Sequence, residues 1–468
     1  MMRKVGRRWI GSLCAIAIAG CAAQPVASGR DGHEAGGIQI PVEYYKLDNG
    51  LKVVLSRDVS APTVTVGIYY HIGFRIEPRS RTGFAHLFEH LMFQGSDNLG
   101  KMEFWRLIEG NGGVVNGSTR LDYTNFFEIA PAHTLETVLW AEADRMKSLA
   151  ITQENLVNQQ GVVKNEVRDN VLNQPYGGFP WLSMPQVANE NWYNAHNFYG
   201  ELADIDAATL EDARVFFETY YVPNNAVLVV AGDFEPAQAR AWIAKYYASI
   251  PARAPPPRPD ISEPAQQHNK QHAYADPLVP RPGLAVAWQV PERGTPEHYA
   301  FGLLDQILLQ GEDSALWQRL VQQRGYAGAV GGGINLLGNQ FNYDGPMLWT
   351  VYLVHDPEVS ADGILADVDA EIARLRDAPP TPAELERALT KIRAGLYELA
   401  GSSTRFGLVD LLAAFALFDD DPARINRIEA GFRAVTPAMI SDVARRYLRD
   451  DNRTVLTVEP GRATGTPP

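Results

Sequence analysis

Two histidines and a glutamate stand within five residues of one another in the apolar segment HLFEHLMFQG, at positions 86 to 95. If the segment is helical, His86 and His90 lie one turn apart on the same face, and Glu89 lies beside them. Imidazole nitrogens bind zinc at about 2.0–2.1 Å, and a neighbouring carboxylate can act as a base. The segment therefore predicts a zinc site on a buried helix. The alternative is a helix with two core histidines and no metal.

A catalytic zinc ion usually has three protein ligands, so a further ligand is expected elsewhere in the chain. The segment QQGVVKNEVRDN contains Glu166 among Val162, Val163 and Val167. This pattern predicts a buried helix whose carboxylate lies on the same side as the valines. Taken alone, Glu166 would be an ordinary surface acid.

The motif HLFEH, followed at this distance by Glu166, resembles the pitrilysin and mitochondrial processing peptidase family of inverted-zincin metallopeptidases. The segments NGLKVVLSRD, GSTRLDYTNFFE and YYVPNNAVLVVAGDF are also similar to strands of that family, and the resemblance runs from about Leu47 to the end of the chain. It implies that His86, His90 and Glu166 bind one zinc ion per chain. It also implies that Glu89 activates water for peptide-bond hydrolysis.

One position departs from the family's pattern. The family commonly has a second glutamate seven residues before the zinc-binding one, and here that position is Gln159. An amide keeps its hydrogen-bonding capacity but carries no charge. A slower or differently pH-dependent enzyme is therefore one interpretation, and a family member without turnover is another.

The N-terminus predicts export. MMRKVGRRW has four basic residues and no acid, GSLCAIAIAG is apolar but too short to span a bilayer, and the segment ends in IAGC. This ending resembles a bacterial lipobox, which implies a signal peptide over residues 1–20 and a lipidated Cys21. The alternative is a plain signal peptide cut near Ala22 or Ala23. By the resemblance the protein is expected in the periplasm, anchored to a membrane, with the outer membrane favoured.

The composition excludes some functions. The only other cysteine, Cys14, lies in the predicted signal peptide, so no disulfide is expected and the core must stabilise the mature chain. The formal net charge is −13, which argues against a nucleic-acid partner and mildly favours basic peptides.

The sequence also predicts two duplicated halves. A flexible tether is expected over residues 21–40, a first half over 41–250, a Pro-rich linker over 251–267, a second half over 268–459 and a disordered tail over 460–468. LMFQGSDN, which begins at Leu91, returns as ILLQGEDS, which begins at Ile307. Strand-like and helical segments alternate without a regular βαβ pattern, which favours an α+β fold. The family resemblance implies a mainly antiparallel sheet backed by helices in each half.

The same offset of 216 residues applied to the metal motif places Gly302, Asp305 and Gln306 where His86, Glu89 and His90 stand. The second half is therefore expected to bind no metal. Within it, Arg319 and Tyr326 match an arginine and tyrosine pair with which the family contacts substrate and the reaction's oxyanion. Both side chains can donate hydrogen bonds to a developing negative charge. The alternative is a surface arginine and a core tyrosine.

Substrate binding is expected near the metal. In VVNGSTRLDYTNFFEIA, Asn116 and Gly117 begin a predicted strand whose position suits pairing with an extended peptide. The alternative is an internal strand with a glycine-marked bulge.

These observations predict a zinc endopeptidase that cleaves peptides or unfolded segments. The family resemblance implies a homodimer, or a heterodimer with a related subunit, since members of this length hold half of the peptide-enclosing chamber. A non-catalytic scaffold or partner subunit is the main alternative, and a peptide-binding lipoprotein without turnover is the other.

Overall fold

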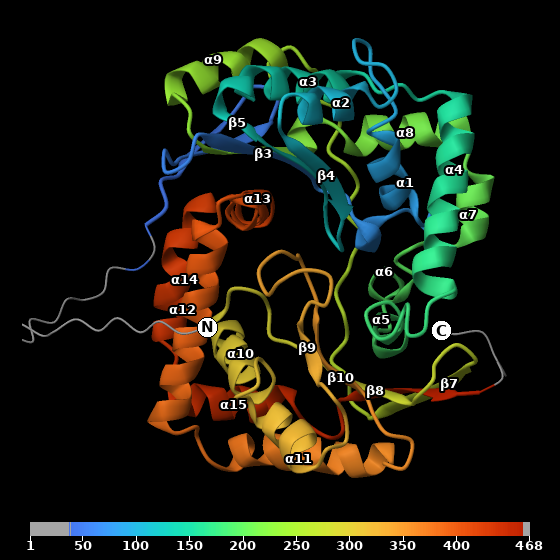
Figure 1. The fold of residues 1–468 in the computed structure, drawn as a ribbon, viewed down its shortest axis with the longest axis vertical. Coiled ribbons are helices and arrows are strands. Elements are labelled where there is room, and N and C mark those ends of the chain that lie inside the picture. The colour runs from blue at the N-terminus through green and yellow to red at the C-terminus, as the bar shows by residue number, and fades with distance from the viewer. Residues whose placement is uncertain (1–36, 38, 462–468) are drawn as a thin grey trace, which may run out of the picture. The chain divides into compact units, whose positions relative to one another are not determined.

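The computed structural model describes residues 37 and 39–461. The predicted signal peptide, the predicted lipidation site Cys21 and most of the predicted tether lie outside this part of the chain, as do residues 462–468. Within it, each half of the sequence forms one β-sheet with its own helices (Figure 1).

The sheet of the first half has six strands in the order β1-β2-β6-β3-β5-β4, and β2 and β6 run parallel while the other neighbours are antiparallel. Nearly every residue of β3 and β6 is buried, because helices cover both faces of the sheet. β4 pairs only with β5, so it forms one edge of the sheet. The strands are β1 (Glu43–Lys46), β2 (Lys52–Arg57), β3 (Thr63–Tyr70), β4 (Val114–Thr119), β5 (Thr124–Pro131) and β6 (Ala226–Gly232).

The second sheet repeats this topology with one strand fewer. Its order is β7-β11-β8-β10-β9, and again one pair, β7 and β11, is parallel. These strands take the places of β2, β6, β3, β5 and β4, which confirms the two similar α+β halves that the sequence repeat predicts. The strands are β7 (Lys270–Asp276), β8 (Gly283–Gln289), β9 (Gly331–Ile334), β10 (Leu348–Val354) and β11 (Thr454–Pro460).

Helices pack against both sheets. The first half contains α1 (Phe84–Leu91), α2 (Glu103–Gly110), α3 (Leu135–Lys147), α4 (Gln153–Val167), α5 (Ser183–Ala188), α6 (Trp192–Ala195), α7 (Leu202–Ala207), α8 (Leu210–Tyr220) and α9 (Pro236–Tyr247). The second half contains α10 (Pro296–Leu308), α11 (Ala361–Asp377), α12 (Pro382–Gly401), α13 (Phe406–Asp419), α14 (Ile428–Arg433) and α15 (Pro437–Tyr447). α4 is followed by a π-helical segment, Arg168–Leu172, and a second one, Trp317–Gln323, precedes β9.

The two halves exchange helices. α13 of the second half packs on β2, β3 and β6, on the opposite side of the sheet from α3 (Figure 1), while α5 of the first half packs on β7, β8 and β11. α13 is apolar except for Asp410 and its terminal Asp419, and its residues Leu408 to Leu417 are buried, as expected for a helix between two layers. Gly67 permits the close approach, since a Cβ atom there would lie 2.7 Å from Val409 Cγ1. Neither sheet is therefore fully covered by its own half.

The Pro-rich segment between the halves, residues 251–269, has no regular secondary structure. Among the described residues, no single helix is both long and apolar enough to cross a membrane. α12 and α13 reach that length and apolar character only when they are taken together, and they are bent by 100° relative to each other. α13 is also buried in the core.

Candidate metal centre

Buried contacts fix the start of the metal helix, α1. The carboxylate of Glu77 accepts hydrogen bonds from the backbone N–H groups of Gly83, at 2.8 Å, and Ala85, at 2.5 Å. Glu77 is fully buried, and burial raises its pKa to about 8 against the effect of the two N–H groups. The first turn of α1 is therefore held immediately before His86.

Three ligand atoms from α1 and α4 converge. Nε2 of His86 lies 3.4 Å from Oε1 of Glu166, and Nε2 of His90 lies 3.2 Å from Oε2 of Glu166. The two Nε2 atoms are 3.3 Å apart. The structure thus brings together the three residues that the sequence predicts as ligands, across 76 positions of chain.

This spacing fits a metal ion. Ligand atoms at about 2.0–2.1 Å from a tetrahedral zinc ion lie about 3.3 Å from one another. Hydrogen bonds alone explain it less well, because two Nε2–H groups that both donate to Glu166 would also face each other. A cation at the centre removes that repulsion. His86 is buried while His90 and Glu166 are partly exposed, which leaves one side open as catalytic zinc sites require.

The charge state of Glu166 suits a ligand. Hydrogen bonds from His86 and His90 hold the pKa of the Glu166 carboxyl far below its usual range, although burial acts in the opposite direction. An ionised carboxylate between two imidazole rings is the form that a divalent cation requires.

Glu89 is held beside the cluster by the edge strand β4. The hydroxyl of Thr119 donates to Oε2 of Glu89 at 2.7 Å, which leaves Oε1 without this contact. Two residues earlier on the same face of the strand, a Cβ atom on Gly117 would lie 3.2 Å from Cγ of Glu89. The absence of a side chain at Gly117 therefore lets the strand approach the predicted base.

β4 is an edge strand, as pairing with a peptide requires, and not an internal strand. Asn116 is exposed on it, and its Oδ1 accepts a hydrogen bond from the backbone N–H of Gly117. Asn116 and Gly117 thus lie in the middle of β4, two residues after its start at Val114.

Sequence reasoning missed Tyr199. Its ring packs edge-on against the ring of His86, with centroids 5.1 Å apart, and it stands in the loop between α6 and α7. Burial raises the pKa of Tyr199 to about 12, and the negative charges of Glu166 and Glu89 add to this effect. The phenol therefore stays protonated, close enough to both carboxylates to feel their charge. Its segment, HNFYG, has no pattern that would have indicated a place near the metal.

The helix that carries Glu166 differs from the prediction in one respect. Val163 and Val167 are buried, but Val162 is 41% exposed, so α4 has one solvent-facing side. Gln159, two turns before Glu166, is buried and donates to Oδ1 of Asn158 at 2.8 Å. Its uncharged side chain is thus accommodated by a neighbouring amide.

Arg319 and Tyr326 do not join the metal cluster. Nε of Arg319 donates to Oδ1 of Asp367 on α11 at 2.8 Å, Arg324 pairs with Oδ2 at 2.9 Å, and Tyr326 is also hydrogen-bonded to Asp367. Among the contacts of residues 39–461, none links Arg319 or Tyr326 to the three ligands. Their role at the oxyanion therefore stays a prediction. In this structure the two side chains share one carboxylate partner, Asp367, within the second half.

The equivalent of the metal site in the second half has no ligands. Asp305 on α10 is buried, accepts hydrogen bonds from Trp349 and Gln310, and burial raises its pKa to about 6. α4 and α12 each begin after a threonine cap, and the position that matches Glu166 from that cap is Gly395. A polar cavity lined by Asp305, Gln306 and Gly395 lies where the first half has its cluster.

Known proteins share this organisation. Residues 52–182 match the family described as Insulinase (Peptidase family M16), and residues 207–392 match the family described as Peptidase M16 inactive domain. The chain is 25% identical over 425 residues to the zinc protease PqqE of Helicobacter pylori, which covers 89% of this chain and 93% of that protein. It is 22% identical over 262 residues to the human mitochondrial cytochrome b-c1 complex subunit 1, over 56% of this chain and 54% of that protein.

The fold is also found in solved structures. The crystal structure of a protease from Helicobacter pylori superposes with a TM-score of 0.84 at 24% identity, over 90% of this chain and all of that one. The first family match contains the three ligand residues and Glu89, and the match to the inactive domain contains Gly302, Asp305 and Gln306, which replace His86, Glu89 and His90. The two matches occur in one chain, in this order and on two similar halves, and the chain therefore belongs to peptidase family M16.

Proposed function

We propose that the protein is a zinc-dependent endopeptidase that hydrolyses peptides or unfolded segments. The observation that carries the proposal is the convergence of His86, His90 and Glu166 at mutual distances of 3.2–3.4 Å, with Glu89 in contact with an edge strand beside them. Membership of a peptidase family and the likeness to a zinc protease support it. One zinc ion per chain is proposed, because ligands are found only in the first half of the described chain.

Zinc in such a site supplies Lewis acidity toward a carbonyl group and water. The chain's own residues would supply the proton transfer. Thr119 occupies Oε2 of Glu89, so Oε1 is the atom that takes a proton from water and passes it to the leaving nitrogen. The unpaired edge of β4 would hold the peptide backbone extended near Glu89. The protonated hydroxyl of Tyr199 can donate to the oxygen that becomes negative.

We also propose where the protein works. The lipobox-like IAGC motif supports attachment through a lipidated Cys21 in the bacterial periplasm, with the outer membrane favoured. A homodimer, or a heterodimer with a related chain, is proposed as the working form. A relative that is named as a subunit of a complex is consistent with this.

A second candidate function is a non-catalytic partner subunit. The likeness to cytochrome b-c1 complex subunit 1 and the amide at Gln159 favour it. The presence of all three ligands together with Glu89 favours the peptidase.

The deciding experiment measures zinc content and peptide turnover on the same preparation. We expect about one zinc ion per chain and loss of turnover with a chelator. Glu89→Gln should keep zinc and lose most turnover, whereas Glu166→Gln should lose zinc. Equal zinc loss in both variants would reverse the assignment of base and ligand. Full zinc occupancy without cleavage of any peptide would favour the partner subunit.

A further inference from the structure

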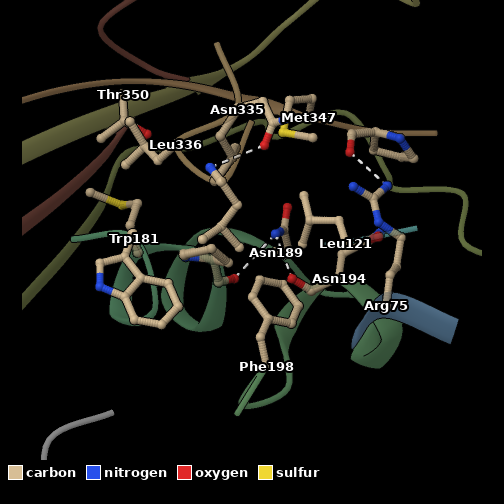
Figure 2. A pocket seen from close by; sticks show the side chains of 15 residues that line it. Arg75, Leu121, Trp181, Asn189, Asn194, Phe198, Asn335, Leu336, Met347 and Thr350 are labelled. Atoms are coloured by element: carbon tan, nitrogen blue, oxygen red, sulfur yellow. Dashed lines mark hydrogen bonds between the residues drawn. The ribbon is translucent and has the colours of Figure 1, made fainter. Parts of the chain in front are cut away.

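A cavity lies between the two halves of the chain (Figure 2). It is partly open to solvent, and its internal volume is about 50 Å³. Trp181 and Phe198 line one side, and Leu336 and Met347 of the second half line the other. The apolar side chains of its lining include Leu121, Trp181, Met184, Phe198, Leu336 and Met347.

Some side chains of the lining are buried in the core, and others are partly exposed to the cavity. Met184 and Phe198 are buried in the surrounding core, whereas Trp181 and Leu336 are only half-buried. Trp181 is oriented by its indole N–H, which donates to the carbonyl of Gly177 at 2.8 Å. The cavity therefore presents apolar surface that a ligand could cover, on side chains that are already positioned.

The cavity is close to the metal cluster. The ring of Trp181 lies 5.4 Å from that of Tyr199, and Tyr199 lies 5.1 Å from His86, measured between centroids. Leu121, which lines the cavity, follows the end of β4 at Thr119 by two residues. A peptide paired along β4 advances about 3.3 Å per residue, so it would reach the cavity two or three residues beyond Glu89.

One polar atom in the lining has no partner. Asn194 is 4% exposed, and its Oδ1 accepts no hydrogen bond from any described residue, although its Nδ2 donates to Ile261 and Glu263. A buried acceptor without a donor is costly. Oδ1 is closed to solvent in this structure, so a peptide N–H group would reach it only after the surrounding side chains move.

We propose that this cavity binds an apolar side chain of the peptide substrate, two or three residues from the scissile bond. This proposal rests on the proposed function and gives it a substrate preference. Arg75 also lines the cavity, but its guanidinium already pairs with Asp122 and donates to the carbonyls of Asp344 and Pro346. Burial of a further charged side chain would therefore be unfavourable, so such substrates would be rejected.

The test uses fluorogenic decapeptides in which each position in turn carries phenylalanine, leucine, glycine or aspartate, with the zinc-loaded protein. We expect kcat/KM to be about tenfold or more higher for the apolar residues than for glycine at one position, two or three residues from the cleaved bond. Leu336→Trp fills the cavity and should remove this preference, while cleavage of the glycine peptide continues. The matched control is Leu278→Trp, at an exposed leucine outside the lining, which should keep it.

A measurement of peptide binding separates this proposal from the proposed function. The same peptides are titrated into zinc-loaded Glu89→Gln, which reports affinity without turnover. If no peptide is cut but this variant still prefers the apolar peptide and loses the preference with Leu336→Trp, the peptidase proposal fails and the cavity proposal stands. Equal kcat/KM and equal affinity for apolar and glycine peptides at every position would overturn the cavity proposal, as would an unchanged preference in Leu336→Trp.

Discussion

Replacing Asp305 with asparagine tests whether the second half has turned the position of a catalytic base into a neutral core residue. Asp305 stands where the first half has Glu89, and it is buried. Trp349 Nε1, at 2.6 Å, and Gln310 Nε2, at 3.2 Å, both donate to the same oxygen, Oδ1. The carbonyl of an amide can accept both bonds, so Asp305→Asn removes the charge and keeps these contacts.

The size of the effect follows from the pKa of Asp305. Burial raises it from an ordinary value of 3.8 to about 6 in the folded protein. Because its pKa is raised, Asp305 binds its proton more tightly in the folded protein than in the unfolded chain. Its contribution to the stability of the folded state is therefore complete below about pH 4 and is lost as the pH rises through about 6. At about 1.4 kcal/mol per pKa unit, the charged form costs roughly 3 kcal/mol at neutral pH. Asp305→Asn should avoid that cost.

Urea unfolding at pH 4 and pH 7.5 measures this difference. We expect the variant and the parent protein to unfold with similar free energies at pH 4, and the variant to be more stable by roughly 2–3 kcal/mol at pH 7.5. Asp313→Asn is the control, because Asp313 is a half-exposed partner of Lys391 and should show no such gain between the two pH values. A variant that is less stable than the parent by the same amount at both pH values would refute the reasoning.

The remaining predictions concern the first half, the Asp367 cluster and the N-terminus. Thr119→Val removes the 2.7 Å hydrogen bond to Glu89 and should lower kcat by about tenfold or more with zinc content unchanged. Thr119→Ser keeps the hydroxyl and should keep kcat near that of the parent protein. An unchanged kcat in the valine variant would show that the hydrogen bond does not position the base. Tyr326→Phe removes a hydrogen bond to Asp367 and should reduce thermal stability slightly with unchanged kcat, so a large loss of kcat would return Tyr326 to the reaction. Cys21→Ala should release the protein from membranes or block its maturation, and mass spectrometry that shows an unmodified N-terminus beginning after Cys21 would contradict the lipid anchor.

Local patterns in the sequence were sufficient for the two histidine ligands. His86 and His90 are four residues apart, and helical geometry alone places them on one face. Glu166 required the family resemblance, because nothing in its own segment distinguishes it from a surface acid. The duplication was readable because the turn after the metal helix, QGSDN, recurs as QGEDS at Gln310.

Contacts between distant segments were not readable. The spacing of Arg319 and Tyr326 says nothing about which residue faces them, and Asp367 lies 48 positions beyond Arg319. Tyr199 reaches the metal cluster through a loop without periodicity. The exchange of α5 and α13 also left no local pattern, since an apolar helix indicates burial but not the sheet on which it packs.

The position of α13 on the first sheet has a consequence for the synthesis of the chain. Thr65 in β3 donates to the carbonyl of Thr404, which is 339 residues later and two residues before the start of α13. At about 5–20 residues per second, roughly 20–70 seconds of translation separate the two segments. The three ligand residues are all made during the first part of this interval, while one face of the sheet behind them still awaits its covering helix. A nascent chain can therefore hold every ligand and still expose an apolar surface that chaperones would recognise.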